Sequence, residues 1–150
     1  MKDFKLNNYT TKIDSSVTIA EIEQILVSFG ATCIVKDYLN GTINAVMFSI
    51  GKEGYKLPAN TAGVEELFKK NRSVYSKVSV AKIEEQAKRV VWRIIKDWLH
   101  NQLSLIATKQ AEPGQVLLPY LFDGKRTLYE AYKEGDMKLL SNDDKENRGV

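Results

Sequence analysis

Three features of the sequence predict an α+β fold, with a small antiparallel sheet packed on a long central helix and shorter helices around it. Two runs rich in β-branched residues flank Asn40-Gly41, the pair preferred in a two-residue hairpin turn. A helical pattern of apolar residues covers residues 79–108 and ends before Pro113-Gly114. Shorter segments that begin with helix-capping residues lie on both sides of these two features.

The composition predicts one domain. The chain has 150 residues, of which 43% are hydrophobic and 27% charged, as in ordinary globular proteins. We expect a single α+β domain over residues 1–140 and a polar, disordered tail at 141–150. The one cysteine, Cys33, cannot form an internal disulfide, and the sequence has neither a signal peptide nor an apolar run of roughly 18 residues. These features predict a soluble cytoplasmic protein with no membrane partner.

The N-terminal third is expected to contain a strand and a helix. Residues 4–14 alternate loosely between apolar and polar side chains and predict the first strand of the sheet. Residues 18–30 have a helical period. Thr18 and Glu21 have the spacing of a capping box, and Gly30 provides the C-terminal stop.

The hairpin around Asn40-Gly41 has a register that follows from its turn. Counting outward pairs Val35 with Val46 and Cys33 with Phe48 on one face, which we interpret as the core face. The opposite face is also fairly apolar, so another element or another subunit is expected to cover part of it. Three strands also leave free edges, and the sequence therefore predicts a homo-oligomer.

Two shorter helices complete the prediction. The first covers residues 62–72 and begins at a cap formed by Asn60 or Thr61. The second follows an Asp123-Gly124 turn, is capped by Thr127, and is expected to pack inward through its leucine and two tyrosines.

One side of the long helix is basic. Residues 69–97 contain nine lysines or arginines and three acidic residues. At 100° per residue, a polar stripe forms that consists of Lys82, Glu85, Gln86, Arg89, Arg93, Lys96 and His100. Trp92 and Trp98 fall in the opposite, apolar arc and are expected in the core. The stripe is either a solvated helix face or a row of cations, one helical turn of about 5.4 Å apart, that contacts phosphates.

The candidate ligand-binding residues are those of the stripe that carry or can gain positive charge: Lys82, Arg89, Arg93, Lys96 and His100. His100 is the only histidine, which excludes a histidine pair for a metal. Neither a phosphate-binding GxxxxGK[ST] loop nor a dinucleotide-binding GxGxxG motif is present. Adjacent pairs of glutamates point to different sides of a helix, which is poor geometry for acid–base catalysis. We therefore expect no enzyme activity, no cofactor and no metal.

Three segments resemble a family of small, functionally uncharacterised proteins of tailed bacteriophages. They are YKLPANT (residues 55–61), QAKRVVWRIIKDWLHNQLSLI (86–106) and LLPYLFDGKRTLYE (117–130), which occur in this order in that family. The resemblance runs over most of the chain and implies no catalytic or ligand residues. It implies a phage context, with DNA metabolism, host takeover and blocking of host immunity as function classes.

The leading hypothesis is a non-enzymatic binding protein whose basic helix face engages nucleic acid or another phosphate-bearing ligand. One alternative is a phage anti-defence protein that inhibits a host immune protein or sequesters its nucleotide signal. A third hypothesis is a virion or assembly component. The sequence leaves these three open, and with them the choice between DNA, RNA, a small nucleotide and a protein as the ligand.

Overall fold

The computed structural model describes residues 4–135, so the tail predicted at 141–150 lies outside the described residues. The elements in chain order are α1 (Ser15–Phe29), β1 (Cys33–Leu39), β2 (Thr42–Ile50), β3 (Glu53–Pro58), α2 (Thr61–Lys70), the 3-10 helix η1 (Val80–Lys82), α3 (Ile83–Ala107), α4 (Pro113–Leu117), the 3-10 helix η2 (Leu118–Tyr120) and α5 (Leu128–Lys133). The predicted α+β class is confirmed.

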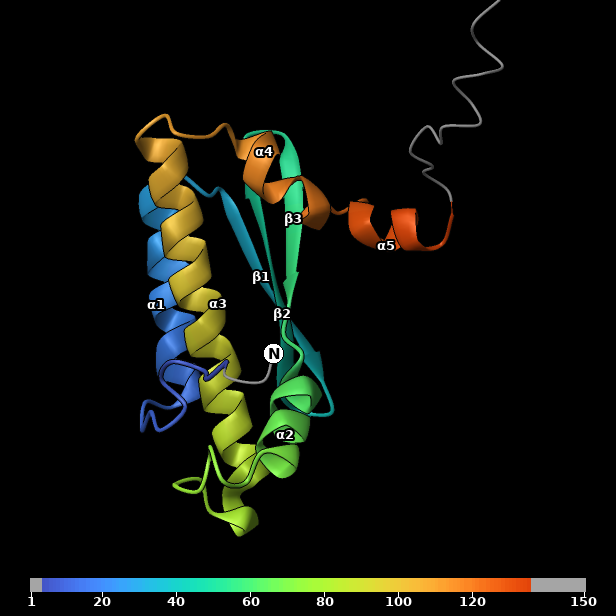
Figure 1. Cartoon of the computed structure of the whole chain (residues 1–150). Helices are drawn as coiled ribbons and strands as arrows, with labels where there is room; N and C mark the ends of the chain where they lie inside the picture. The colour runs from blue at the N-terminus through green and yellow to red at the C-terminus, as the bar shows by residue number, and fades with distance from the viewer. Residues whose placement is uncertain (1–3, 136–150) are drawn as a thin grey trace, which may run out of the picture.

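The strands form one antiparallel sheet in the order β1-β2-β3. The helices α1 and α3 lie side by side as a layer against this sheet (Figure 1). α2 packs against the first half of α3, while α4 and η2 follow the far end of α3 and lead back to β3. The long helix is thus the element that most of the others contact, as the sequence predicts.

The core lies between the sheet and the helices. Trp92 of α3 is 2% exposed, and Leu99 on the same helix is fully buried. The sheet contributes Val46 and Phe48 to the same cluster, and α1 contributes Ile22. Trp98 is only partly buried and packs edge-on against Tyr120, with 5.1 Å between the ring centroids. Trp92 is therefore the core tryptophan, and Trp98 attaches η2 to α3.

The predicted N-terminal strand is wrong, because residues 4–14 form turns and irregular structure and the third strand of the sheet is β3. Asn8 has a φ of 60°, which breaks an extended conformation. The carbonyl oxygens of Tyr9 and Thr11 both accept hydrogen bonds of 2.9 Å from Gln86 Nε2 of α3. The backbone of this segment is thus satisfied by a helix side chain and not by a neighbouring strand.

The predicted capping box of α1 is also wrong. The helix begins at Ser15, and its N-cap is Asp14, whose carboxylate accepts a 2.9 Å hydrogen bond from the Ser16 amide. Thr18 lies inside the helix and is fully buried. The predicted stop at Gly30 is confirmed, because Gly30 has a φ of 111° and its amide donates to carbonyls of the last turn.

The hairpin keeps its predicted turn, and β2 keeps its predicted core residues Val46 and Phe48, but the predicted core face of β1 is wrong. A β-bulge between Asp37 and Tyr38 shifts the register beyond it by one residue. Since a shift of one residue moves every side chain to the other face, Cys33 is exposed and Val35 is 47% exposed. Ile34 takes the inward position and packs against the core cluster.

The shorter helices begin where the sequence predicts. Asn60 caps α2 by accepting a 3.0 Å hydrogen bond from the Gly63 amide. Thr127 caps α5 in a capping box with Glu130. The expected inward packing of the α5 tyrosines is wrong, because Tyr129 is 55% exposed and Tyr132 is 45% exposed.

The shifted register predicts that the Cys33 thiol of the folded protein reacts fully with Ellman's reagent. The side chain is exposed at the start of an edge strand, so no unfolding step precedes the reaction. Stopped-flow rates in buffer and in denaturant should agree within a small factor. A thiol that reacts only after unfolding would indicate that Cys33 points into the core, which would contradict the register shift at the bulge.

Candidate anion-binding groove

The structure divides the predicted basic stripe into two parts. The stripe faces α1 and the N-terminal segment, and a carboxylate of α1 offsets part of the charge at its middle. Arg93 Nη1 lies 2.7 Å from Glu21 Oε2 and 3.4 Å from Thr18 Oγ1, and the Arg93 side chain is only 15% exposed. Lys96 Nζ lies 3.4 Å from the same Glu21 oxygen. Arg93 and Lys96 therefore hold the two helices together.

Glu21 stays ionised between these two cations. Partial burial raises the pKa of its carboxyl, but the hydrogen bond from Arg93 and the charges of Lys96 and Arg93 outweigh burial and hold the pKa below its ordinary value of 4.5. One carboxylate thus offsets part of the charge of two stripe residues near neutral pH.

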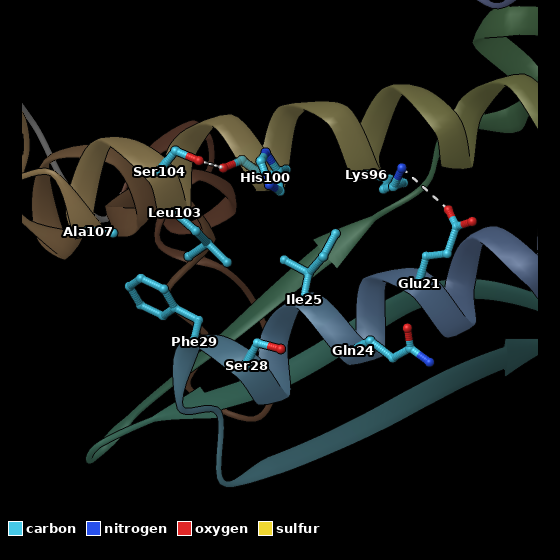
Figure 2. Close-up of a pocket in the computed structure, with 10 residues that line it drawn as sticks. All are labelled: Glu21, Gln24, Ile25, Ser28, Phe29, Lys96, His100, Leu103, Ser104 and Ala107. Atoms are coloured by element: carbon cyan, nitrogen blue, oxygen red, sulfur yellow. Dashed lines mark hydrogen bonds and ion pairs between the residues drawn. The ribbon is translucent and has the colours of Figure 1, made fainter.

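The C-terminal end of the stripe lines an open cleft between α1 and α3. Figure 2 shows Lys96 directed toward Glu21 and His100 at the rim, above the apolar side chains of Ile25 and Leu103. The cleft has a volume of ≈ 590 Å³. Its one lysine is already paired, so the chemistry of this cleft gives little reason for a phosphate to bind there.

The N-terminal end of the stripe lines a second, basic groove. This groove has a volume of ≈ 430 Å³ and is bounded by the N-terminal segment, the loop before η1 and the first turns of α3. It is lined by Tyr9, Thr10, Thr11, Lys12, Lys77, Val78, Ser79, Lys82, Gln86 and Arg89. Four of these residues are cations, and none is acidic. We call these ten residues the basic groove.

The walls of the basic groove are held in place by buried contacts. Gln86 fixes the N-terminal segment through the two carbonyls described above, and its Oε1 atom lies 3.3 Å from Arg89 Nη1. Tyr9 packs edge-on against the buried Tyr75 with 5.2 Å between ring centroids. Val78, 4% exposed, anchors the loop that carries Lys77. Backbone segments that carry the cations are therefore ordered before any ligand arrives.

The charge of the basic groove is only weakly compensated. Lys12, Lys77 and Lys82 make no ion pair with a carboxylate of residues 4–135. Asp14 is the acidic residue that interacts with Arg89 electrostatically. Hydrogen bonds from the Ser16 amide, and then from its hydroxyl, lower the pKa of Asp14, and the positive charge of Arg89 lowers it further. Arg89 thus interacts with a carboxylate that already accepts hydrogen bonds from Ser16.

The structure brings two of the five predicted ligand-binding residues into this groove. Lys82 and Arg89 lie in the basic groove, whereas Arg93, Lys96 and His100 do not. Lys12 and Lys77 were missed, because they come from irregular segments that a helical wheel does not include. The excess of cations over residues 69–97 is a sequence signal for Lys77 but does not cover Lys12.

Comparisons with models of protein families, with curated proteins and with solved structures find no match to this chain. Among residues 4–135, no group of three or more histidine, cysteine, aspartate or glutamate side chains is placed to hold a metal ion. No helix of that same part of the chain is long and apolar enough to cross a membrane. We therefore infer function from the geometry and charge of the grooves.

Replacing Glu21 with glutamine should lower the free energy of unfolding at pH 7 by about 1 to 2 kcal/mol, because a mostly buried Arg93 loses its charged acceptor. The pKa of Glu21 is lower in the folded chain than its ordinary 4.5, so the stabilisation is complete above that pH and is lost as the pH falls through the folded value. The free energies of unfolding of the wild type and the variant, measured by denaturant titration, should therefore become equal in acid.

Glu23→Gln is the matched control for this prediction. Glu23 also lies on α1 and pairs with Lys36 at 3.0 Å, but the Lys36 side chain is 40% exposed, against 15% for Arg93. Solvent screens the more exposed pair, so Glu23→Gln should lower the free energy of unfolding by less than Glu21→Gln. Equal losses in the two variants, or a Glu21 effect that does not change with pH, would contradict the assignment.

Proposed function

We propose that this protein binds nucleic acid or another phosphate-bearing ligand in the basic groove. The observation that supports this proposal is the concave site with four cations and no acidic lining residue, set in walls that are already ordered. Phosphate contacts by lysine and arginine dominate nucleic-acid affinity. The groove also lacks histidine, cysteine and carboxylate, so the proposal is for a binding protein and not for an enzyme.

The four cations suit phosphate in different ways. The guanidinium of Arg89 presents a planar set of donors that matches two phosphate oxygens, and the bond to Gln86 limits its rotation. Lys12, Lys77 and Lys82 are point charges on flexible stems that adjust to a ligand. Because these residues come from three segments of the chain, a ligand with more than one phosphate uses them best. The phage context suggested by the sequence segments is part of this proposal.

The double variant Lys77→Gln/Lys82→Gln should weaken binding to labelled single-stranded DNA, duplex DNA or RNA, whichever binds the wild type. Each lost phosphate contact lowers the slope of log affinity against log salt by about 0.9 for a duplex and 0.7 for a single strand. Two losses should lower the slope by about 1.5. Fluorescence anisotropy across a salt series measures this slope.

Lys52→Gln/Lys125→Gln is the control, with the same change of charge at two exposed lysines. Lys52 belongs to the turn between β2 and β3, and this turn lies at the opposite end of the molecule from the start of α3 (Figure 1). This variant should keep the wild-type slope. Equal slopes in all three proteins, or no binding of any nucleic acid or of inorganic pyrophosphate at low salt, would refute the proposal.

The free edge of β1 supports a second candidate function, the binding of another protein. β1 pairs with β2 alone among the described strands, and its edge is flanked by exposed Val35, Tyr38 and Leu39. Its two charges are already paired, Lys36 with Glu23 and Asp37 with Lys56. Free charges normally protect an edge strand from added strands, so this edge favours an extended, partly apolar segment of a partner.

Val35→Asp should abolish stoichiometric recovery of such a partner from bacterial lysate, because it puts a carboxylate on the outer face of the edge strand. Val27→Asp is the control, since Val27 is 62% exposed and belongs to α1 and not to the edge strand. Recovery by wild type and by the Val27 variant alone is the expected result. A wild type that recovers no partner, or a partner retained by Val35→Asp, counts against this function.

A further inference from the structure

A second kind of site lies where the C-terminal segment packs on the sheet. A cavity of ≈ 570 Å³ is enclosed by β2 and β3 on one side and by η2 and the start of α5 on the other. Its lining residues are Asn44, Lys56, Pro58, Pro119, Tyr120, Thr127, Tyr129 and Glu130. None of these belongs to the basic groove, and five belong to the segment at residues 117–130 that the proposed function leaves unexplained. We call these eight residues the ring-lined cavity.

The walls of the ring-lined cavity are fixed. The Phe122 amide donates a 2.8 Å hydrogen bond to the Gly54 carbonyl, and Leu121 forms a bridge with Tyr55 of β3. The ring of Tyr120 is held by Trp98. The start of α5 is held by its capping box and by the 2.8 Å bond from the Leu128 amide to the Leu121 carbonyl. The segment thus extends the sheet edge and keeps the cavity open.

The two charged residues of the cavity already have partners. Lys56 Nζ lies 3.9 Å from the Asp37 carboxylate and 5.2 Å from the centroid of the Phe122 ring. Glu130 Oε1 accepts hydrogen bonds from the amide and the hydroxyl of Thr127, at 3.2 and 3.0 Å. Lys56 is paired with a carboxylate, whereas Glu130 keeps its negative charge because Thr127 is a neutral donor, so the cavity offers no free cation to an anionic ligand.

Rings dominate what remains of the lining. Four of the eight residues carry rings: Pro58 and Pro119 have puckered apolar rings, and Tyr120 and Tyr129 have planar aromatic rings, which favour contact with another aromatic ring. The Asn44 amide and the Tyr129 hydroxyl make no hydrogen bond within residues 4–135, so they are available to orient a polar substituent. Small-molecule sites have this character, with volumes of roughly 300–1,000 Å³, mostly apolar walls and a few polar groups.

We propose that the ring-lined cavity binds a small, uncharged, planar aromatic molecule that carries one hydrogen-bonding substituent. Tyr129 is the specificity-determining residue. Its ring is 55% exposed and, within the described chain, touches another aromatic ring only at Tyr132, 6.4 Å away between centroids. A tyrosine that is more than half exposed contributes little to the core, and its ring is available to contact a ligand in the cavity that it lines.

The test uses three probes of similar size on the full chain. They are naphthalen-2-ol, its saturated counterpart decahydronaphthalen-2-ol, and the anion naphthalene-2-sulfonate. Saturation-transfer NMR measures binding, and amide shifts of isotope-labelled protein locate it. Naphthalen-2-ol should bind most tightly and should shift the amides of Asn44, Lys56, Tyr120 and Thr127.

Variants of the two α5 tyrosines separate the proposal from general hydrophobic binding. Tyr129→Ala should weaken the binding of naphthalen-2-ol about 2- to 12-fold, which corresponds to the loss of one aromatic contact. Tyr129→Phe should restore most of the affinity. Tyr132→Ala, on the same helix but outside the cavity, should match the wild type. No binding, equal binding of the saturated probe, tighter binding of the sulfonate, or equal loss in both alanine variants would overturn the proposal.

Discussion

The enclosure of α3 by the sheet, α1 and α2 is the constraint on which the rest of the structure depends. Burying Trp92, Val90 and Leu99 removes a large apolar area from water and fixes the position of the helix. The N-terminal segment and α1 cover part of the polar side of this helix, so the polar side chains there need hydrogen-bond partners from the protein in place of water. Gln86 therefore bonds the carbonyls of the N-terminal segment, and Arg93 bonds Glu21 of α1. The N-terminal segment is held by these bonds, so it needs no place in the sheet.

The same constraint decides which cations are available to a ligand. Arg93 and Lys96 face α1, where Glu21 offsets their charge. Lys82 and Arg89 lie nearer the start of the helix, where irregular segments approach and add Lys12 and Lys77 instead of a neutralising carboxylate. Packing thus turns a continuous basic stripe into a structural ion-pair cluster and a separate basic groove. Of these two parts, the basic groove combines a concave shape with three lysines that make no ion pair within residues 4–135.

Sequence reasoning succeeds where local chemistry decides the outcome and fails where tertiary contacts do. The Asn40-Gly41 turn, the cap at Thr127 and the extent of the long helix follow from local signals, and all three are present. The bulge at Asp37 has no comparable signal, and one extra residue is enough to turn Cys33 outward. The loose alternation of residues 4–14 predicts a strand whose carbonyls accept hydrogen bonds from a neighbouring strand. In the structure the Gln86 side chain donates to two of these carbonyls instead.

The candidate site shows the same division. A helical wheel finds Lys82 and Arg89 because they share one helix face. It also selects Arg93 and Lys96, since a wheel cannot show that a glutamate from another helix lies against them. Lys12 is 77 residues from Arg89 in the chain (89 minus 12), and only the fold brings the two to one groove. Sites built across loops are therefore beyond a periodicity argument.

The measurement that tests the central claim most directly is an amide chemical-shift titration of the isotope-labelled protein with a short oligothymidylate and, separately, with inorganic pyrophosphate. We expect shifts confined to the basic groove, at residues 9–12, 77–82 and 86–89. Residues 96–107, around the cleft between α1 and α3, should remain unchanged. Shifts centred on Lys96 and His100, or none with either ligand at low salt, would contradict the claim that packing confines phosphate binding to that groove.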